Sequence, residues 1–343
     1  MSNNTVTCIC PKDTKNRNVA IAISVTLLVI LIIFSIFLGL ILGNKNRFFS
    51  VKVLMRLAPS GFTVVNRARD CIRKNEPHAF ALMRGDIMDS IISKMKPVRY
   101  DNQSDLLLRG DKKAVFISNH LPSNIDFLYL LNNLYEQFPQ IHASLVAGGE
   151  DNIKLLYYWI KALKWCLIHK KPYSNDDTES LLHAADENQF VVIYPEGAVL
   201  KPKNFEESEA HRLYLLKKKG LKLKSHRNVV LPRPRGLHVL LNSGKFDTLY
   251  DYTTAYLGFR GGPDLGQDDN NSMQPSLMAI ANRDTSGGIV YDVEKIDVKK
   301  TFGDKPTLDQ VAAWLNKKWD EKEAKLDYFA KYQRFPPRKI VIE

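Results

Sequence analysis

Two short apolar runs, each followed at once by polar residues, constrain the fold of this chain most. Residues 114–117 lead into a stretch that carries His120 and Asp126, and residues 191–193 lead into Tyr-Pro-Glu-Gly at 194–197. Uninterrupted apolar runs of this length are typical of buried strands in an α/β sheet. Because such sheets bind ligands beyond the carboxyl ends of their strands, we expect both polar stretches to contribute to one site.

The residue types also have a structural interpretation. A histidine and an aspartate lie a few residues apart by chance in many proteins, and a glycine after a strand often only makes a turn. A glutamate at this point can cap the helix that follows. On the residues alone, a structural role for Glu196 and a functional one are about equally supported.

Further blocks follow in a fixed order. The chain has Leu-Ile-His-Lys-Lys at 167–171, Val-Val-Leu-Pro-Arg-Pro-Arg-Gly at 229–236, a charged tryptophan-containing segment at 314–323 and Phe-Pro-Pro at 335–337. Together with the first two stretches, this order resembles the glycerophospholipid acyltransferase family of the 1-acylglycerol-3-phosphate acyltransferase type. The resemblance covers most of the chain, and it is closest to the branch of the lysophosphatidylglycerol, lysocardiolipin and lysophosphatidylinositol acyltransferases.

The resemblance implies an α/β domain with a mixed central sheet flanked by helices. It implies transfer of a fatty acyl group from acyl-CoA, as co-substrate, to a hydroxyl of a lysophospholipid, with lysophosphatidylglycerol favoured. His120 and Asp126 would be the catalytic pair, and no cofactor or metal would be needed. The residues that it implies for substrate binding are Lys170, Pro195, Glu196, Gly197, Lys201, Lys203, Pro232 and Arg233.

Acyl transfer explains why these residue types are needed. The acceptor hydroxyl must lose its proton as it attacks the thioester, and a histidine with a pKa near neutrality suits that task. A carboxylate on the other ring nitrogen fixes the tautomer, and Asp126 is the candidate. No acyl-enzyme is required, because the CoA thiol is a good leaving group. The chain also has no Gly-x-Ser-x-Gly elbow of a serine hydrolase.

Three departures from the family pattern bear on activity. The spacing between His120 and Asp126 is one residue longer than in the family, so either the turn holds an insertion or the acid is absent. Pro122 favours the insertion, because its fixed φ suits a turn. Gly197 is followed by Ala-Val, where the family has Thr and often Arg, and Lys170 replaces an arginine. The alternative is therefore a catalytically impaired, membrane-bound lipid-binding or scaffold protein of the same fold.

Composition favours a membrane surface as the partner. Lys and Arg total 49 against 37 Asp and Glu, which gives a net charge of +12 and attracts anionic headgroups. Nucleic acid is the weaker option, because the chain has no zinc-finger spacing, RNA-binding signature or basic zipper. The four cysteines, Cys8, Cys10, Cys71 and Cys166, indicate neither a disulfide framework nor a zinc site.

Residues 19–43 contain no charged residue and are long enough to cross a bilayer, which predicts a transmembrane helix. A cleaved signal peptide is the alternative, although its apolar region would be shorter. We expect a membrane protein with one span, or with added re-entrant contacts. The endoplasmic reticulum is the first choice of organelle and a mitochondrial membrane the second, with the catalytic domain in the cytosol where the family finds acyl-CoA.

The expected organisation has five parts. Near its end, Thr307 and Gln310 form a capping box that predicts the start of a helix. The parts are a polar tail at 1–18, the membrane helix at 19–43, amphipathic connecting helices at 44–100, the acyltransferase domain at 101–300 and a helical extension at 301–343.

Overall fold

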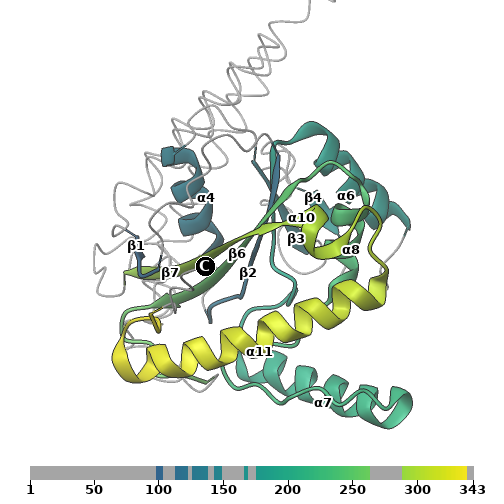
Figure 1. Ribbon diagram of the computed structural model, residues 1–343. Helices are drawn as coiled ribbons and strands as arrows, with labels where there is room; N and C mark the ends of the chain where they lie inside the picture. The colour runs from purple at the N-terminus through teal and green to yellow at the C-terminus, as the bar shows by residue number, and fades with distance from the viewer. Residues whose placement is uncertain are drawn as a thin grey trace, which may run out of the picture. The chain divides into compact units, whose positions relative to one another are not determined.

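A computed structural model describes residues 98–102, 113–122, 126–137, 143–148, 166–168, 175–262 and 288–337 of the chain. Figure 1 shows their arrangement. The predicted tail, membrane helix and most of the connecting helices lie outside these residues and stay predictions. In chain order the elements are β1 (Arg99–Tyr100), β2 (Ala114–Ser118), α4 (Asp126–Gln137), β3 (Ala143–Gly148), β4 (Cys166–Ile168), α6 (Asn175–Glu187), β5 (Phe190–Ile193), α7 (Pro202–Lys219), α8 (Pro234–Asn242), β6 (Thr248–Tyr256), β7 (Ile289–Asp297), α10 (Val298–Phe302) and α11 (Leu308–Tyr332).

The described strands form one mixed sheet in the order β1-β7-β6-β2-β5-β3-β4. Neighbouring strands are parallel except for β6 and β7, which are antiparallel. The predicted α/β fold with a mixed central sheet and flanking helices is confirmed. Both predicted strands are present, since β2 and β5 contain the two apolar runs and every residue of each is buried.

Strands β2 and β5 lie side by side in the middle of the sheet. Their register pairs Ile117 with Ile193, so the two strands end at the same level of the sheet. His120 and Glu196 each follow their paired isoleucine by three residues. The register therefore delivers these two residues to the same place at the carboxyl edge of the sheet.

Helix α11 covers the part of the sheet built by β6 and β7. It begins at the predicted capping box, which is confirmed: the Thr307 hydroxyl accepts from the Gln310 N–H, and the Gln310 side chain accepts from the Thr307 N–H. Its buried side chains recur every three or four residues, and they include a lysine: Val311, Leu315, Trp319, Lys322, Leu326 and Phe329. This spacing is that of one helix face.

Ion pairs join α11 to the sheet as well as apolar contacts. The Lys322 ammonium pairs with Asp251 of β6, and Lys325 pairs with Asp292 of β7 at 2.6 Å. Figure 1 shows α11 crossing below the strands, with α7 on the side of α11 that faces away from them. Within the described residues, none of the helices combines the length and apolar character needed to cross a bilayer.

Candidate active site

His120 and Glu196 are joined directly at the edge of the sheet. The backbone N–H of His120 donates to Oε2 of Glu196 at 2.9 Å. The segment leaving β2 is held on its other side by Asn119, whose side chain exchanges two hydrogen bonds with the backbone of Thr254 in β6. Two neighbouring strands thus fix the backbone that carries the histidine.

The extra residue in the His-Asp spacing does not separate the pair. Asp126 is the first residue of α4, and its Oδ2 lies 2.8 Å from Nδ1 of His120. The same oxygen accepts the Leu121 N–H, and Oδ1 accepts the Phe127 N–H, both at 2.9 Å. The carboxylate is buried, and these donors replace the water that it has lost. Residues 123–125 lie outside the described part of the chain.

The His120 ring lies on the ring of Tyr194. Their centroids are 4.0 Å apart and the planes differ by 14°. Burial works to lower the pKa of His120, but the charge and hydrogen bond of Asp126, with the charge of Glu196, outweigh it and leave the pKa raised. Tyr194 stacks without competing for the ring nitrogens, so Nδ1 remains bonded to the carboxylate.

Glu196 is a fully buried carboxylate with a donor on each oxygen. Oε2 accepts from the His120 backbone, and Oε1 accepts from Nε1 of Trp319 at 2.9 Å. Burial raises the pKa of Glu196 to about 7, against the opposing effects of His120, the Trp319 hydrogen bond and Lys322. The glutamate therefore connects the histidine segment to α11. The sequence did not predict this contact, although its charged tryptophan-containing segment is one of the blocks that carry the resemblance.

The Arg233 side chain lies against Gly197, beside Glu196. Gly197 has a φ of 63°, which glycine adopts without strain, and a Cβ at this position would lie 3.4 Å from Nη1 of Arg233. The Arg233 N–H donates to the Pro195 carbonyl at 2.7 Å, which joins the segment before α8 to the one after β5. The exposed Arg233 side chain thus lies over the turn that carries Glu196.

The other basic residues that were expected to bind substrate do not lie over the turn after β5 in the described residues. Lys201 and Lys203 are exposed at the start of α7, and Pro232 is buried beside Arg233. Lys170 lies outside the described residues. The geometry therefore brings Arg233 against the turn after β5, whereas the lysines flank that turn at the start of the next helix.

Lys322 was not expected near the site. It is buried, donates to the Tyr252 carbonyl at 2.6 Å, and lies 5.1 Å from the centre of the Trp319 ring. Its pKa is lowered, because burial outweighs the attraction of Asp251. The signal in the sequence was a lysine on the apolar face of α11, four or fewer residues from Trp319 and Leu326.

The arrangement suits proton transfer. With Nδ1 bonded to Asp126, a neutral His120 carries its lone pair on Nε2, the nitrogen that can accept a proton. Within the parts of the chain that the structure describes, no group of three or more His, Cys, Asp or Glu side chains could hold a metal ion. The one described cysteine, Cys166, is a buried free thiol.

This chain is similar to a known protein family and to one protein of known name. Residues 98–224 match the model of the Acyltransferase family. Over 244 residues, the chain is 28% identical to the 1-acyl-sn-glycerol-3-phosphate acyltransferase delta of Bos taurus, a match that covers 68% of this chain and 57% of that protein. The chain thus spans a little over half the length of this relative. By their names, both the matched family and this relative are acyltransferases.

One solved structure is also similar. It is the 1-acyl-sn-glycerophosphate acyltransferase PlsC of Thermotoga maritima, with a TM-score of 0.43 and 12% sequence identity. The match covers 82% of this chain and 97% of that one.

Proposed function

We propose that this chain is an acyl-CoA-dependent O-acyltransferase that moves a fatty acyl group to a free hydroxyl of a lysophospholipid. The observation that supports this most is the bond of 2.8 Å between Nδ1 of His120 and Oδ2 of Asp126. The alternative, an impaired lipid-binding or scaffold protein, rested on three departures from the family pattern, and one of them was a spacing that could have kept these groups apart. Their contact favours the enzyme.

In the proposed reaction, Nε2 of His120 removes the proton of the acceptor hydroxyl as its oxygen attacks the thioester carbonyl of acyl-CoA. The C–O bond forms, the C–S bond breaks, and the proton on Nε2 passes to the leaving CoA thiolate. Asp126 stabilises the imidazolium that exists between these two transfers. Glu196 acts on the backbone of His120 and is a positioning residue in this scheme.

We assign the phosphate of the lysolipid to the basic residues near Glu196. Arg233 is the first choice, because its guanidinium lies over Gly197 and can bind phosphate through two parallel hydrogen bonds. Lys170, Lys201 and Lys203 remain candidates for the phosphates of the lysolipid or of CoA. The hydrogen bond from the Arg233 backbone N–H to the Pro195 carbonyl holds the backbone of Arg233 beside the turn that carries Glu196.

Two related lipids are candidates for the acceptor. The name of the Bos taurus relative specifies 1-acyl-sn-glycerol-3-phosphate, whereas the sequence blocks are most similar to those of the lysophosphatidylglycerol type. Both lipids present a phosphate and a free hydroxyl on one glycerol unit. We propose lysophosphatidylglycerol, and a membrane location, first the endoplasmic reticulum, where both the lysolipid and acyl-CoA are accessible.

The test is an acceptor panel. Microsomes containing the full-length protein would be given labelled acyl-CoA with lysophosphatidylglycerol, lysophosphatidic acid, lysophosphatidylinositol or lysocardiolipin, beside microsomes containing His120→Ala. We expect labelled phosphatidylglycerol above the His120→Ala background. Labelled product from another lysolipid instead would reassign the acceptor. Equal labelling by both proteins with every acceptor would contradict the enzymatic proposal.

A further inference from the structure

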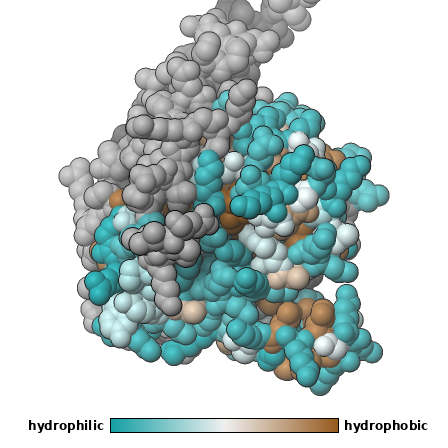
Figure 2. Space-filling model, viewed as in Figure 1, coloured by the Kyte–Doolittle hydropathy of each residue, from teal (hydrophilic) through white to brown (hydrophobic). Residues whose placement is uncertain are grey.

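The end of α7 gathers most of the exposed large apolar side chains in the described residues. Seven such side chains are exposed, and four of them lie within residues 213–221: Leu213 at 44%, Tyr214 at 54%, Leu216 at 37% and Leu221 at 46%. Figure 2 shows apolar surface gathered where Figure 1 places α7. We call residues 213–224 the α7 tip. Single exposed leucines are common, but a cluster of this kind marks an interaction surface.

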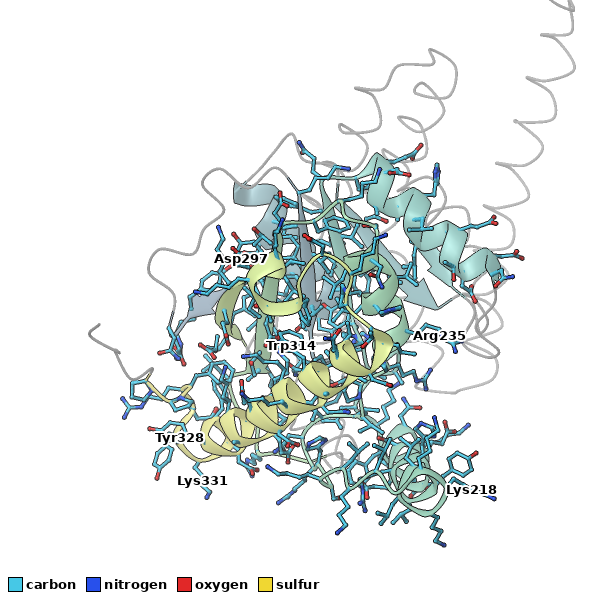
Figure 3. The ribbon with its side chains drawn as sticks, turned by 45° about the vertical axis from the view of Figure 1, so that its right-hand side comes forward. Lys218, Arg235, Asp297, Trp314, Tyr328 and Lys331 are labelled. Atoms are coloured by element: carbon cyan, nitrogen blue, oxygen red, sulfur yellow. The ribbon has the colours of Figure 1, made fainter. Side chains whose placement is uncertain are left out.

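The α7 tip is also strongly basic. It contains five lysines, Lys217, Lys218, Lys219, Lys222 and Lys224, and no acidic residue. Figure 3 shows Lys218 at the end of α7. Lys224 pairs with Asp320 of α11 at 3.2 Å, and no such pair is found for the other four in the described part of the chain. A partner of the α7 tip must therefore accept both leucine side chains and positive charge.

Helix α7 projects from the domain. None of its residues is buried, and it is held near its start and along one side by three polar contacts: Asn204 with the Val199 carbonyl, Ser208 with the Leu231 N–H, and Arg212 with the Leu223 carbonyl. Beyond the tip, the chain is fixed to α11 again through Asn228, which bonds to Glu323. None of these hydrogen bonds involves the four apolar side chains, which are 37 to 54% exposed.

Charge is divided along α7. Glu206, Glu207 and Glu209 lie in its first half, and the run of lysines begins only after Leu216. The helix ends at Gly220, whose φ of 66° turns the chain so that Leu221 comes directly after the basic last turn. The run of lysines and the exposed apolar side chains thus lie at the same end of α7, a combination that fits the boundary between anionic headgroups and acyl chains.

We propose that the α7 tip docks onto an anionic lipid surface, with its leucines entering the interface and its lysines against the headgroup phosphates. This would be a contact with the bilayer separate from the membrane helix expected at residues 19–43. Docking of the tip does not depend on acyl-transfer chemistry. Because α7 begins soon after Glu196 in the chain, a docked tip would also hold the site close to the lipid that it is proposed to use.

Lipid-attached quenchers can test docking in the full-length protein. Leu216→Cys would carry an environment-sensitive fluorophore in a background where Cys8, Cys10 and Cys71 are serine and the buried Cys166 is kept. The matched control is Leu182→Cys on α6, because Leu182 is 38% exposed and Leu216 is 37% exposed. Both proteins would be reconstituted in vesicles of phosphatidylcholine, with or without phosphatidylglycerol, that contain spin-labelled lipid.

We expect quenching at residue 216 to be roughly twofold or more above that at residue 182 in anionic vesicles, and to fall to the control level in neutral ones. The combined change Lys217→Gln, Lys218→Gln and Lys219→Gln should remove the excess, as should high salt. Equal quenching at the two positions would overturn the proposal. So would a label at 216 that stays in water in both vesicles, which would leave the tip as a surface for another protein.

Discussion

The Trp319 indole donates a hydrogen bond to Oε1 of Glu196 across 123 positions of the chain. The other oxygen of Glu196 holds the backbone of His120. Helix α11 is therefore part of the support of the proposed base, although it lies near the end of the chain. Removal of this one N–H should weaken the support of Glu196 and His120, whereas α11 should stay folded.

Trp319→Phe keeps an aromatic ring in the core and removes the donor. It should destabilise the fold by about 1 kcal/mol near pH 5 and by about 2 to 3 kcal/mol near pH 8, because the lost bond is stronger to an ionised carboxylate. The loss of stability grows with pH because the pKa of Glu196 is about 7: its carboxyl is mainly protonated below that pH and ionised above it. Urea unfolding at both pH values measures the difference. Trp314→Phe on the same helix, where the ring packs on Phe302, should show no such pH dependence.

The acid limb of the pH profile should report His120. Its pKa is raised above the ordinary value of 6.5, so the neutral base is lost, and the rate falls, as the pH drops through this raised pKa. Asp126→Asn removes the charge that opposes burial, so the limb should move to lower pH while the maximal rate also falls. Asp304→Asn, at an exposed carboxyl, is the control. An unmoved limb in Asp126→Asn would mean that another group titrates.

Gly197→Ala separates backbone strain from contact with Arg233. Both Gly197 and Gly244 have positive φ, 63° and 65°, so alanine at either position should cost about 1 to 2 kcal/mol of stability. At Gly197 the new Cβ also meets the Arg233 side chain, whereas at Gly244 it meets nothing within 4 Å. The KM for the lysolipid should rise roughly two- to fivefold in Gly197→Ala alone. Matching KM values in both variants would show that a Cβ in contact with the Arg233 side chain leaves acceptor binding unchanged.

Lys322→Met tests the buried ion pair under α11. The side chains of Lys322 and Asp251 are 1% and 2% exposed, so methionine would leave a buried, unpaired aspartate. We expect a loss of about 3 to 5 kcal/mol in the free energy of unfolding. Lys299→Met, which breaks an exposed pair with Asp304, should change it by less than about 1 kcal/mol. Asp251→Asn combined with Lys322→Met should recover part of the loss.

The sequence predicted the centre of the sheet because burial on both faces leaves a continuous apolar run. The runs at 114–117 and 191–193 became β2 and β5, and the capping box at Thr307 marked the start of α11. Whether Asp126 could reach His120 stayed open. A turn can accommodate a single inserted residue locally, or the insertion can move the residues of the next helix out of position. The answer depends on the backbone of a loop, which residue types alone do not specify.

The contacts of α11 could not be predicted either, because their partners lie far away in the sequence. Lys322 is buried because Asp251, 71 positions earlier, lies beneath it, and a lysine on an apolar stripe is more often expected to reach solvent. The Trp319 bond likewise needs the exact placement of α11 across the strands. Lys170 and the membrane helix at 19–43 lie outside the described residues and remain predictions.

Substitution of the proposed base tests the central claim most directly. His120→Ala, made in the full-length protein, should lower the transfer of labelled acyl groups from acyl-CoA to lysophosphatidylglycerol by roughly 100-fold or more, the scale of general-base catalysis. The variant should stay folded and membrane-bound, because the His120 ring bonds only to Asp126 and stacks on Tyr194 in the described residues. Turnover equal to that of the unaltered protein would contradict the account.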